Sequence, residues 1–176
     1  MSSGVFDTAG SQTLYLWVDV KTPGPATWPF VVRALEPLRS RGYLTKVSDD
    51  QIVWGAVTVI GTGATPLNQV APVANRDYFY DGPLQSLAKN NITATISPIA
   101  SAQLSSIVGK GTPLNKTQIE TLHKLVGEAA ALGIKSRLWD LPEWPIKTRD
   151  TVWRQLVDEV YLLNVDDLEA AATGAW

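Results

Sequence analysis

The sequence predicts an α/β protein whose parallel strands are joined by helical crossovers, and three observations support this. First, short runs rich in β-branched and aromatic residues alternate with segments whose apolar residues recur at helical spacing. Second, no linker, low-complexity tract or internal repeat divides the 176 residues. Third, with 45% hydrophobic and 18% charged residues, the chain can bury a core of ordinary size. Alternation of this kind is typical of βαβ units.

The expected elements follow one another along the whole chain. Six strands are expected at residues 14–20, 56–61, 77–81, 92–97, 134–140 and 160–165. Helices are expected between them at residues 26–43, 83–90, 115–133 and 149–159. The third of these helices has the clearest ends, because Thr117 stands three residues before Glu120 as a capping box and Gly133 follows as a stop signal.

Composition excludes several classes of function. Fifteen basic and seventeen acidic residues are scattered in both signs, so neither nucleic acid nor an anionic membrane surface is an expected partner. The absence of cysteine excludes disulfides and thiolate chemistry. No apolar run approaches the roughly 18 residues of a membrane span, and residues 1–12 form a polar segment without the features of a signal peptide. We therefore expect one domain over residues 13–176 and leave the compartment open.

Polar residues stand at the carboxyl ends of the expected strands, where a strand buried on both faces should remain apolar. In barrels and doubly wound sheets this edge carries the active site. The pattern predicts a polar ring at one mouth, although helix caps and turn formers would also account for single positions. The ring consists of Asp19 and Lys21, Gly61 to Gly63, Asp81, Ser97, Asp140, and Asn164 with Asp166.

Asp19 and Lys21 attract most interest, because side chains two residues apart in a strand point to the same face. A carboxylate and an ammonium together could hold a divalent cation and a phosphate oxygen. A simple ion pair is the alternative. The sequence "PGPAT" that follows suits a tight loop close to a ligand, and equally a plain strand-to-helix turn.

Several motifs resemble the fungal phosphatidylinositol-phospholipase-C-like phosphodiesterases of the altered-inheritance-of-mitochondria type, a branch of the glycerophosphodiester phosphodiesterase superfamily. The resemblance covers about residues 13–170, and its most specific piece is "RLWDLPEWPIKTRDTVW". The other pieces are "VDVKT", "WPFVVRALEPLRSRGYLT", "VTVIGTGATP", "RDYFYDGPL" and "LLNVDDL". It implies an incomplete TIM barrel whose strands 3 to 8 are the six runs above, without the two N-terminal βα units.

The resemblance also implies roles for individual residues. The superfamily cleaves phosphodiesters with a divalent cation, such as Mg²⁺, and two histidines. Asp19 would match a metal-ligating acid, Lys21 a phosphate-binding lysine and Trp139 the aromatic wall of the pocket, with Asp140 beside it. The only histidine, His123, lies in an expected outer helix beside its apolar stripe, so a surface position is expected.

A barrel without two of its units, at 176 residues against about 250 for a complete one, would expose two sheet edges. We therefore expect a homo-oligomer that covers them.

We predict that the protein is a phosphodiesterase homologue that has lost hydrolysis and uses the pocket at the barrel mouth for a small molecule or another reaction. Its catalytic candidates are Asp19, Lys21 and Asp140, and its substrate-binding candidates are Trp17, Trp139, Asp81, Ser97 and Asn164. A metal-dependent phosphodiesterase and a non-catalytic assembly module are the alternatives.

Overall fold

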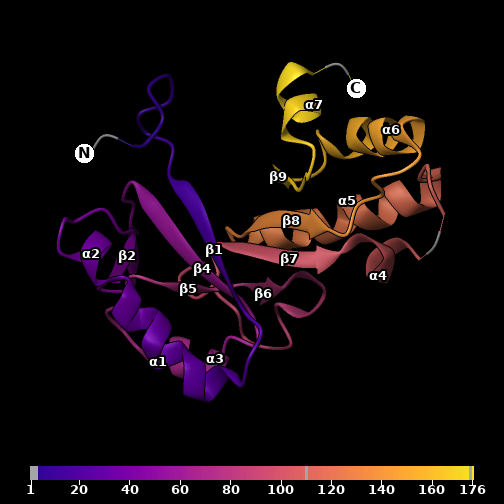
Figure 1. Ribbon diagram of the computed structural model, residues 1–176. Coiled ribbons are helices and arrows are strands. Elements are labelled where there is room, and N and C mark those ends of the chain that lie inside the picture. Colours follow the sequence, from indigo (N-terminus) through magenta and orange to yellow (C-terminus); the bar gives the residue numbers. More distant parts are fainter. Residues whose placement is uncertain (1–3, 110, 175) are drawn as a thin grey trace. The chain divides into compact units, whose positions relative to one another are not determined.

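The computed structural model describes residues 4–109, 111–174 and 176, which form two compact units. Unit 1 contains residues 4–81 with Thr95–Ser97, and unit 2 contains Gly82–Ala94 with the described residues from Pro98 onward. Each unit has its own parallel sheet flanked by helices, so the predicted α/β class is confirmed (Figure 1). The strands that the structure describes form no closed barrel.

Unit 1 is built on a sheet with the order β1-β4-β5, in which both pairings are parallel. Its strands are β1 (Leu14–Val20), β4 (Val57–Gly63) and β5 (Phe79–Tyr80). A separate antiparallel hairpin joins β2 (Lys46–Ser48) to β3 (Gln51–Val53). The helices of this unit are α1 (Gly24–Ala34), α2 (Glu36–Arg39) and α3 (Leu67–Val70).

Trp28 of α1 anchors the core of unit 1. Its side chain is 2% exposed, and its ring meets that of Tyr78 edge-on with centroids 5.4 Å apart. The strand beneath must have glycine at position 61, because a Cβ there would lie 2.6 Å from the Trp28 ring. Trp28 thus packs α1 against β4 at Gly61.

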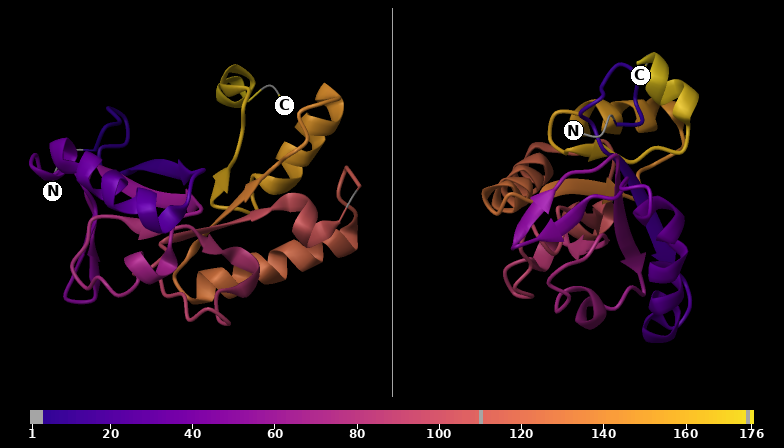
Figure 2. Two further views of the ribbon diagram at one scale, coloured as in Figure 1. Left: turned by 60° about the horizontal axis from the view of Figure 1, so that its bottom comes forward. Right: turned by 90° about the vertical axis from the view of Figure 1, so that its left-hand side faces the viewer.

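Unit 2 has a four-stranded parallel sheet with the order β6-β7-β8-β9. Its strands are β6 (Gly82–Pro83), β7 (Ile99–Gln103), β8 (Lys135–Trp139) and β9 (Leu162–Leu163). The helices are η1 (Leu84–Ser86), α4 (Leu104–Val108), α5 (Lys116–Ala131), α6 (Ile146–Leu156) and α7 (Leu168–Thr173). In each view of Figure 2, α5 runs beside β7 and β8, and it buries Leu122 and Ala129.

Two predicted elements are wrong. Residues 92–97 are not a strand: the carbonyls of Thr95 and Ile96 accept hydrogen bonds from Arg76 Nη2 and the Tyr80 amide, and the strand begins later, at Ile99. Long-range contacts here override the β-propensity of "ITATIS". The helix expected at 83–90 is reduced to the 3₁₀ turn η1.

The best predicted helix is confirmed as α5, with a different cap. Asn115, not Thr117, is the N-cap: its side chain accepts from the Gln118 amide, and the Gln118 side chain accepts from the Asn115 amide. Gly133 follows the helix at φ +72°, as the predicted stop requires. None of the helices in the described part of the chain is both long and apolar enough to cross a membrane.

Candidate functional site

In unit 1, the carboxyl edge of the sheet carries Asp19, Thr62 and Asp81 in one row. Asp19 is the register partner of Thr62. The Asp81 amide donates to the Gly61 carbonyl at 2.9 Å, which extends the β4–β5 pairing by one residue and brings Asp81 level with Thr62. Adjacent strands lie about 4.8 Å apart, so the two acidic residues are separated by roughly 10 Å across the sheet. Asp19 and Asp81, which were both predicted from their positions at strand ends, therefore lie along the same edge of the sheet.

Asp19 and Lys21 form an ion pair, with Nζ 2.7 Å from Oδ2. The two side chains are 46% and 80% exposed, so water screens the attraction and the pair is easily rearranged. Gly63 makes room for the carboxylate: it has φ +65°, and a Cβ there would overlap Asp19 Oδ1. The simple ion pair expected as an alternative is thus present, and it leaves the ammonium exposed to solvent.

Two further predicted residues of unit 1 are less exposed. Trp17 lies in β1 opposite Ile60, with its ring 5.6 Å from that of Tyr15. Ser97 is completely buried and precedes β7, so the prediction that it ends a strand is wrong. Its burial follows from the displaced strand, because residues 95–97 pack with unit 1 instead of forming a strand.

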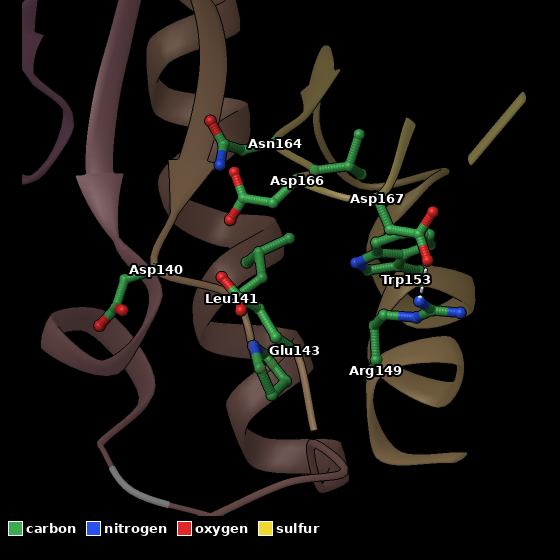
Figure 3. Close-up of a pocket in the computed structure, with 10 residues that line it drawn as sticks. Asp140, Leu141, Glu143, Arg149, Trp153, Asn164, Asp166 and Asp167 are labelled. Carbon is green, nitrogen blue, oxygen red and sulfur yellow. Dashed lines mark hydrogen bonds and ion pairs between the residues drawn. The ribbon is translucent and has the colours of Figure 1, made fainter. Parts of the chain in front are cut away.

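Unit 2 has its own cavity of about 400 Å³ beyond the carboxyl ends of β8 and β9 (Figure 3). Three residues of the predicted polar ring, Asp140, Asn164 and Asp166, line it, while Trp139 ends β8 with 41% of its surface exposed. The rest of the lining comprises two acidic residues, one arginine, one indole and three aliphatic residues. These other residues are Leu141, Pro142, Glu143, Arg149, Trp153, Val165 and Asp167.

Asp140 has an unusual backbone conformation, with φ +59° directly after β8. Few non-glycine residues adopt it, and aspartate is among those that tolerate it best. Its carboxylate accepts a hydrogen bond from Gln103 Nε2 at 2.6 Å. β7 and β8 therefore hold Asp140 at the cavity rim, and a strained residue beside a cavity is a reason to suspect function.

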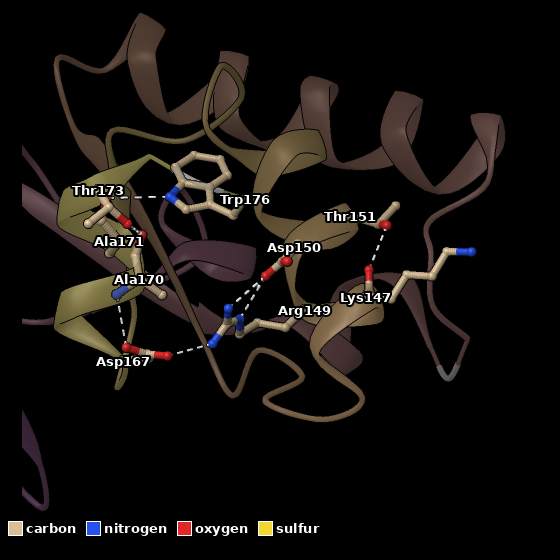
Figure 4. Close-up of polar contacts among 9 residues, drawn as sticks. All are labelled: Lys147, Arg149, Asp150, Thr151, Asp167, Ala170, Ala171, Thr173 and Trp176. Carbon is tan, nitrogen blue, oxygen red and sulfur yellow. Dashed lines mark hydrogen bonds and ion pairs between the residues drawn. The ribbon is translucent and has the colours of Figure 1, made fainter.

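Arg149 joins the two C-terminal helices on the other side of the cavity (Figure 4). Its guanidinium contacts the Asp150 carboxylate at 2.8 Å and the Asp167 carboxylate at 2.6 Å, and it lies 4.7 Å above the Trp153 ring. Asp167 also caps α7 by accepting from the Ala170 amide. Trp176 packs edge-on against Trp153 at 5.7 Å, so the chain end is held to α6 as well.

Glu143 and Asp166 form a carboxyl pair within the cavity lining. A hydrogen bond to Asp166 raises the pKa of Glu143 above its ordinary value, and the charges of Asp166 and Asp140 add to the effect. The opposite shift is seen at Asp167, whose pKa is lowered by the Ala170 amide and by Arg149. The pKa values of two carboxyl groups of one lining are thus shifted in opposite directions.

The described residues do not fit a complete metal site. Within residues 4–109, 111–174 and 176, no three His, Asp or Glu side chains gather in a way that could hold a metal ion. Hard divalent cations take about six oxygen ligands, whereas Asp19 offers one carboxylate that is already paired with an ammonium. Asp19 as a metal ligand stays a prediction that requires ligands from elsewhere.

His123 is exposed on α5, as expected, and its Nδ1 lies 3.0 Å from Glu159 Oε2.

The structure thus distributes the predicted residues over its two units. Asp19, Lys21, Trp17, Asp81 and Ser97 belong to unit 1, and Trp139, Asp140 and Asn164 belong to unit 2.

Sequence reasoning missed two sets of residues. Glu143 lies in a loop, and Arg149 and Trp153 lie in α6. A search for polar residues at the ends of strands therefore does not identify them. Arg137 lies inside β8 and donates a hydrogen bond to Asn164 of the cavity lining, and the signal that could have found it is a cation within a buried strand.

Comparison with known proteins supports the predicted family. A model of the AIM6-like phosphodiesterase domain matches residues 1–81. An altered inheritance of mitochondria protein 6 homolog from Arthroderma benhamiae is 51% identical over 175 residues, covering 96% of this chain and 55% of the relative. This chain is a relative of the AIM6-like phosphodiesterases. The predicted family resemblance is confirmed.

More distant relatives match over the same extent of this chain. Proteins named altered inheritance of mitochondria protein 6 from Lachancea thermotolerans and Candida glabrata are 30% and 33% identical. They match 94% and 97% of this chain, and 45% and 47% of their own lengths. The chain spans about half the length of the curated relatives it matches. No solved structure gave a significant match.

Proposed function

We propose that this chain binds a phosphodiester through Lys21, next to Asp19 at the carboxyl edge of the β1–β4–β5 sheet. The observation that carries the proposal is the exposed ion pair, in which an ammonium 80% exposed is tethered to one carboxylate. An anion can displace that carboxylate at low cost, because exposed pairs contribute little to stability. A phosphate oxygen is a stronger acceptor for lysine than water is. The relationship to phosphodiesterases supplies the class of ligand.

For the chain by itself, we propose binding without appreciable hydrolysis. General acid and base catalysis typically contributes about 10² to 10⁴-fold to a rate. The single histidine of the sequence, His123, is exposed on α5 and engaged with Glu159. Asp81 is the remaining candidate for proton transfer in unit 1, and Asp140 is the candidate in unit 2. A metal-dependent phosphodiesterase is the second candidate function, favoured by the family name, and it would require further groups around Asp19.

Binding of bis(p-nitrophenyl) phosphate, followed by isothermal titration calorimetry, tests the first proposal. Lys21→Ala should weaken binding roughly 10- to 100-fold, because it removes a charge-assisted hydrogen bond. Lys46→Ala is the matched control, since Lys46 is another exposed lysine of unit 1 and should bind like the wild type. Equal affinities of the Lys21→Ala and wild-type proteins would overturn the proposal.

Asp19→Asn separates the two candidate functions. If Asp19 only pairs with Lys21, the substitution frees the ammonium and binding should strengthen. If Asp19 holds a cation for hydrolysis, the substitution should abolish any manganese-dependent release of p-nitrophenol. The same measurement on the wild type decides whether the isolated chain hydrolyses the ester at all.

Two broader predictions also stay proposals. We propose that the strands of both sheets correspond to strands 3 to 8 of a TIM barrel, with β5 and β6 counted as one strand because only Asp81 separates them. The parallel pairings and the family relationship support this proposal. We also propose self-association through β1, which is an edge strand of its sheet among the described residues and has Leu14 40% and Leu16 38% exposed. Light scattering that gives the mass of a monomer at all concentrations would overturn self-association.

A further inference from the structure

Unit 1 has a cavity of about 470 Å³ whose lining contains none of the site residues predicted from the sequence. Its walls come from α1, α2, β2 and residues 75–78, which lead into β5. Val47 and Arg76 hold two of these segments together, because the Val47 amide donates to the Arg76 carbonyl at 2.8 Å. The volume is within the range of roughly 300 to 1,000 Å³ that is typical of small-molecule sites.

Arg76 is the unusual residue of this lining, because its buried guanidinium is hydrogen-bonded to uncharged acceptors. It is 7% exposed, and its Nη1 and Nη2 donate to the carbonyls of Val73 and Thr95, each at 2.5 Å. Within the part of the chain that the structure describes, Arg76 forms no ion pair and its Nε has no hydrogen-bond partner. The two carbonyls occupy only two of the five N–H donors of a guanidinium and leave its charge in place.

The surroundings of Arg76 compensate its charge only in part. Burial lowers the pKa of Arg76 below the ordinary value of arginine, and the nearby Tyr78 and Asp50 oppose this shift without cancelling it. A poorly solvated ion without an opposite charge close by is costly to a fold. An anion that enters the cavity therefore meets a cation that it can stabilise.

Tyr78 supplies a hydrogen-bond donor to the same cavity. It is 8% exposed, and its ring packs edge-on against Trp28. Burial and, to a smaller extent, the charge of Asp77 raise the pKa of Tyr78, so the hydroxyl keeps its proton at neutral pH. Among the described residues this hydroxyl makes no hydrogen bond, which leaves it available to a ligand.

The other cations of the lining compete less for an anion. Arg39 donates to the Asp77 carboxylate at 2.5 and 3.0 Å and to the Glu36 carboxylate at 2.8 Å, so its charge is already balanced. Lys46 is exposed, and water with its dissolved salt screens the charge of the ammonium. Arg76 is therefore the cation of this lining that gains most from a bound anion.

We propose that this cavity binds a small carboxylate with an apolar body, held by the Arg76 guanidinium and the Tyr78 hydroxyl. A carboxylate matches a guanidinium because both are planar and two parallel hydrogen bonds can join them. Its single negative charge matches the charge of Arg76, and Val32 and Val47 provide an apolar wall for the rest of the ligand. This site goes beyond the proposed function, because its cavity, residues and ligand class are all different.

Titration with benzoate, followed by NMR of the ¹⁵N-labelled chain, tests the inference. The amide signals of Val47 and Asp77 should shift, and benzamide, which has a similar shape without the charge, should bind at least about 10-fold more weakly. Tyr78→Phe should weaken benzoate binding roughly 10- to 100-fold, since it removes a hydrogen bond to a charged group. Its melting temperature should be unchanged or higher, because the lost hydroxyl bonds no other group in the described chain.

Two further variants test the role of the guanidinium. Arg76→Lys keeps a positive charge and loses the planar fork, so benzoate binding should weaken by a similar factor. If Arg76→Lys does not fold, Tyr78→Phe still decides the question. Arg41→Ala is the control for general charge: Arg41 is an exposed arginine of unit 1 outside the lining, and this variant should bind benzoate like the wild type.

The outcomes decide the inference independently of the proposed function. Unchanged benzoate affinity in Tyr78→Phe would overturn it, and so would equal affinities of the wild type for benzoate and benzamide. The absence of any shift with about 10 mM benzoate, or an equal loss of binding in Arg41→Ala, would overturn it as well. Lys21 is intact in all of these variants, so a failure to bind phosphodiester at Lys21 and a failure to bind benzoate in this cavity are separate results.

Discussion

Replacement of Gly63 with alanine should destabilise unit 1 and disturb the Asp19 carboxylate. Gly63 ends β4 with φ +65°, in the left-handed region that favours glycine. A Cβ at this position would lie 2.6 Å from the carbonyl oxygen of Val20, closer than van der Waals contact allows, and would also overlap Asp19 Oδ1. The substitution therefore introduces both backbone strain and a steric clash at the end of β1.

The expected cost has two main contributions. A left-handed conformation costs an L-residue about 1 kcal/mol relative to glycine. The clash with Val20 adds about 1 to 2 kcal/mol, because a backbone carbonyl in a sheet cannot rotate away. The overlap with Asp19 adds little, since its exposed side chain can turn at the expense of the pair with Lys21. The sum is a loss of roughly 2 to 3 kcal/mol in the free energy of unfolding.

Urea unfolding followed by tryptophan fluorescence measures this loss. Gly127→Ala is the control: Gly127 lies inside α5 with open space around its Cβ position, so alanine should stabilise the protein by up to about 1 kcal/mol. Combining Gly63→Ala with Asp19→Ala should recover less than about 0.5 kcal/mol, because the carboxylate is mobile. A cost below about 0.5 kcal/mol for Gly63→Ala alone would refute the reasoning, since the strain and the carbonyl contact would then be absent.

Three further outcomes are expected. Thr45→Val removes the hydroxyl that bonds Thr58 at 2.7 Å and accepts from the Gly55 amide at 2.9 Å, so urea unfolding should show a loss of about 1 to 3 kcal/mol. Because the pKa of Glu143 is raised, its contribution to stability is present below its ordinary pKa and is lost as pH rises through the folded value. The difference in melting temperature between the wild type and Glu143→Gln should therefore shift in favour of Glu143→Gln as the pH rises above the ordinary pKa of a glutamate. Asp140→Asn should match the wild type in urea unfolding, and Asp140→Gly should differ by less than about 1 kcal/mol, because relief of its left-handed conformation offsets the lost bond from Gln103.

The fold was predictable where local pattern and burial agree. β1 and β4 are rich in β-branched and aromatic residues, and α5 has both an apolar stripe and clear end signals. β7 was missed because "IASAQ" consists mainly of small residues, whereas the preceding "ITATIS" has the stronger β-propensity and is held in turns by Arg76 and Tyr80. A single sequence does not reveal such long-range contacts.

The hairpin of unit 1 was also missed, although a local signal exists. Asp49 and Asp50 lie between β2 and β3 with φ of +52° and +57°, as a two-residue hairpin loop requires. The sequence "DD" is a weaker signal for this turn than "NG" or "DG". The strands beside it have only three residues each, too few to show alternation.

The candidate site was predictable only at strand ends. That rule found Asp19, Asp81, Asp140 and Asn164 because the carboxyl ends of parallel strands share an edge within each sheet. It could not find Arg137, which lies within β8 and donates to Asn164 of the cavity lining. A search for charged residues inside the expected strands would have identified both Lys135 and Arg137.

The charged contacts of the two units differ in what they can do. Arg149 is 11% exposed on its side chain, contacts two carboxylates and stacks on Trp153, so releasing it would leave partly buried charges without partners. Its arrangement is suited to fastening α7 to α6. The pair of Asp19 and Lys21 is mostly exposed, and separating it costs little because water solvates both groups. A ligand can therefore compete for Lys21 but not for Arg149. This difference favours Lys21 as the residue that binds a phosphodiester, although Arg149 lines a cavity and Lys21 lies on an exposed sheet edge.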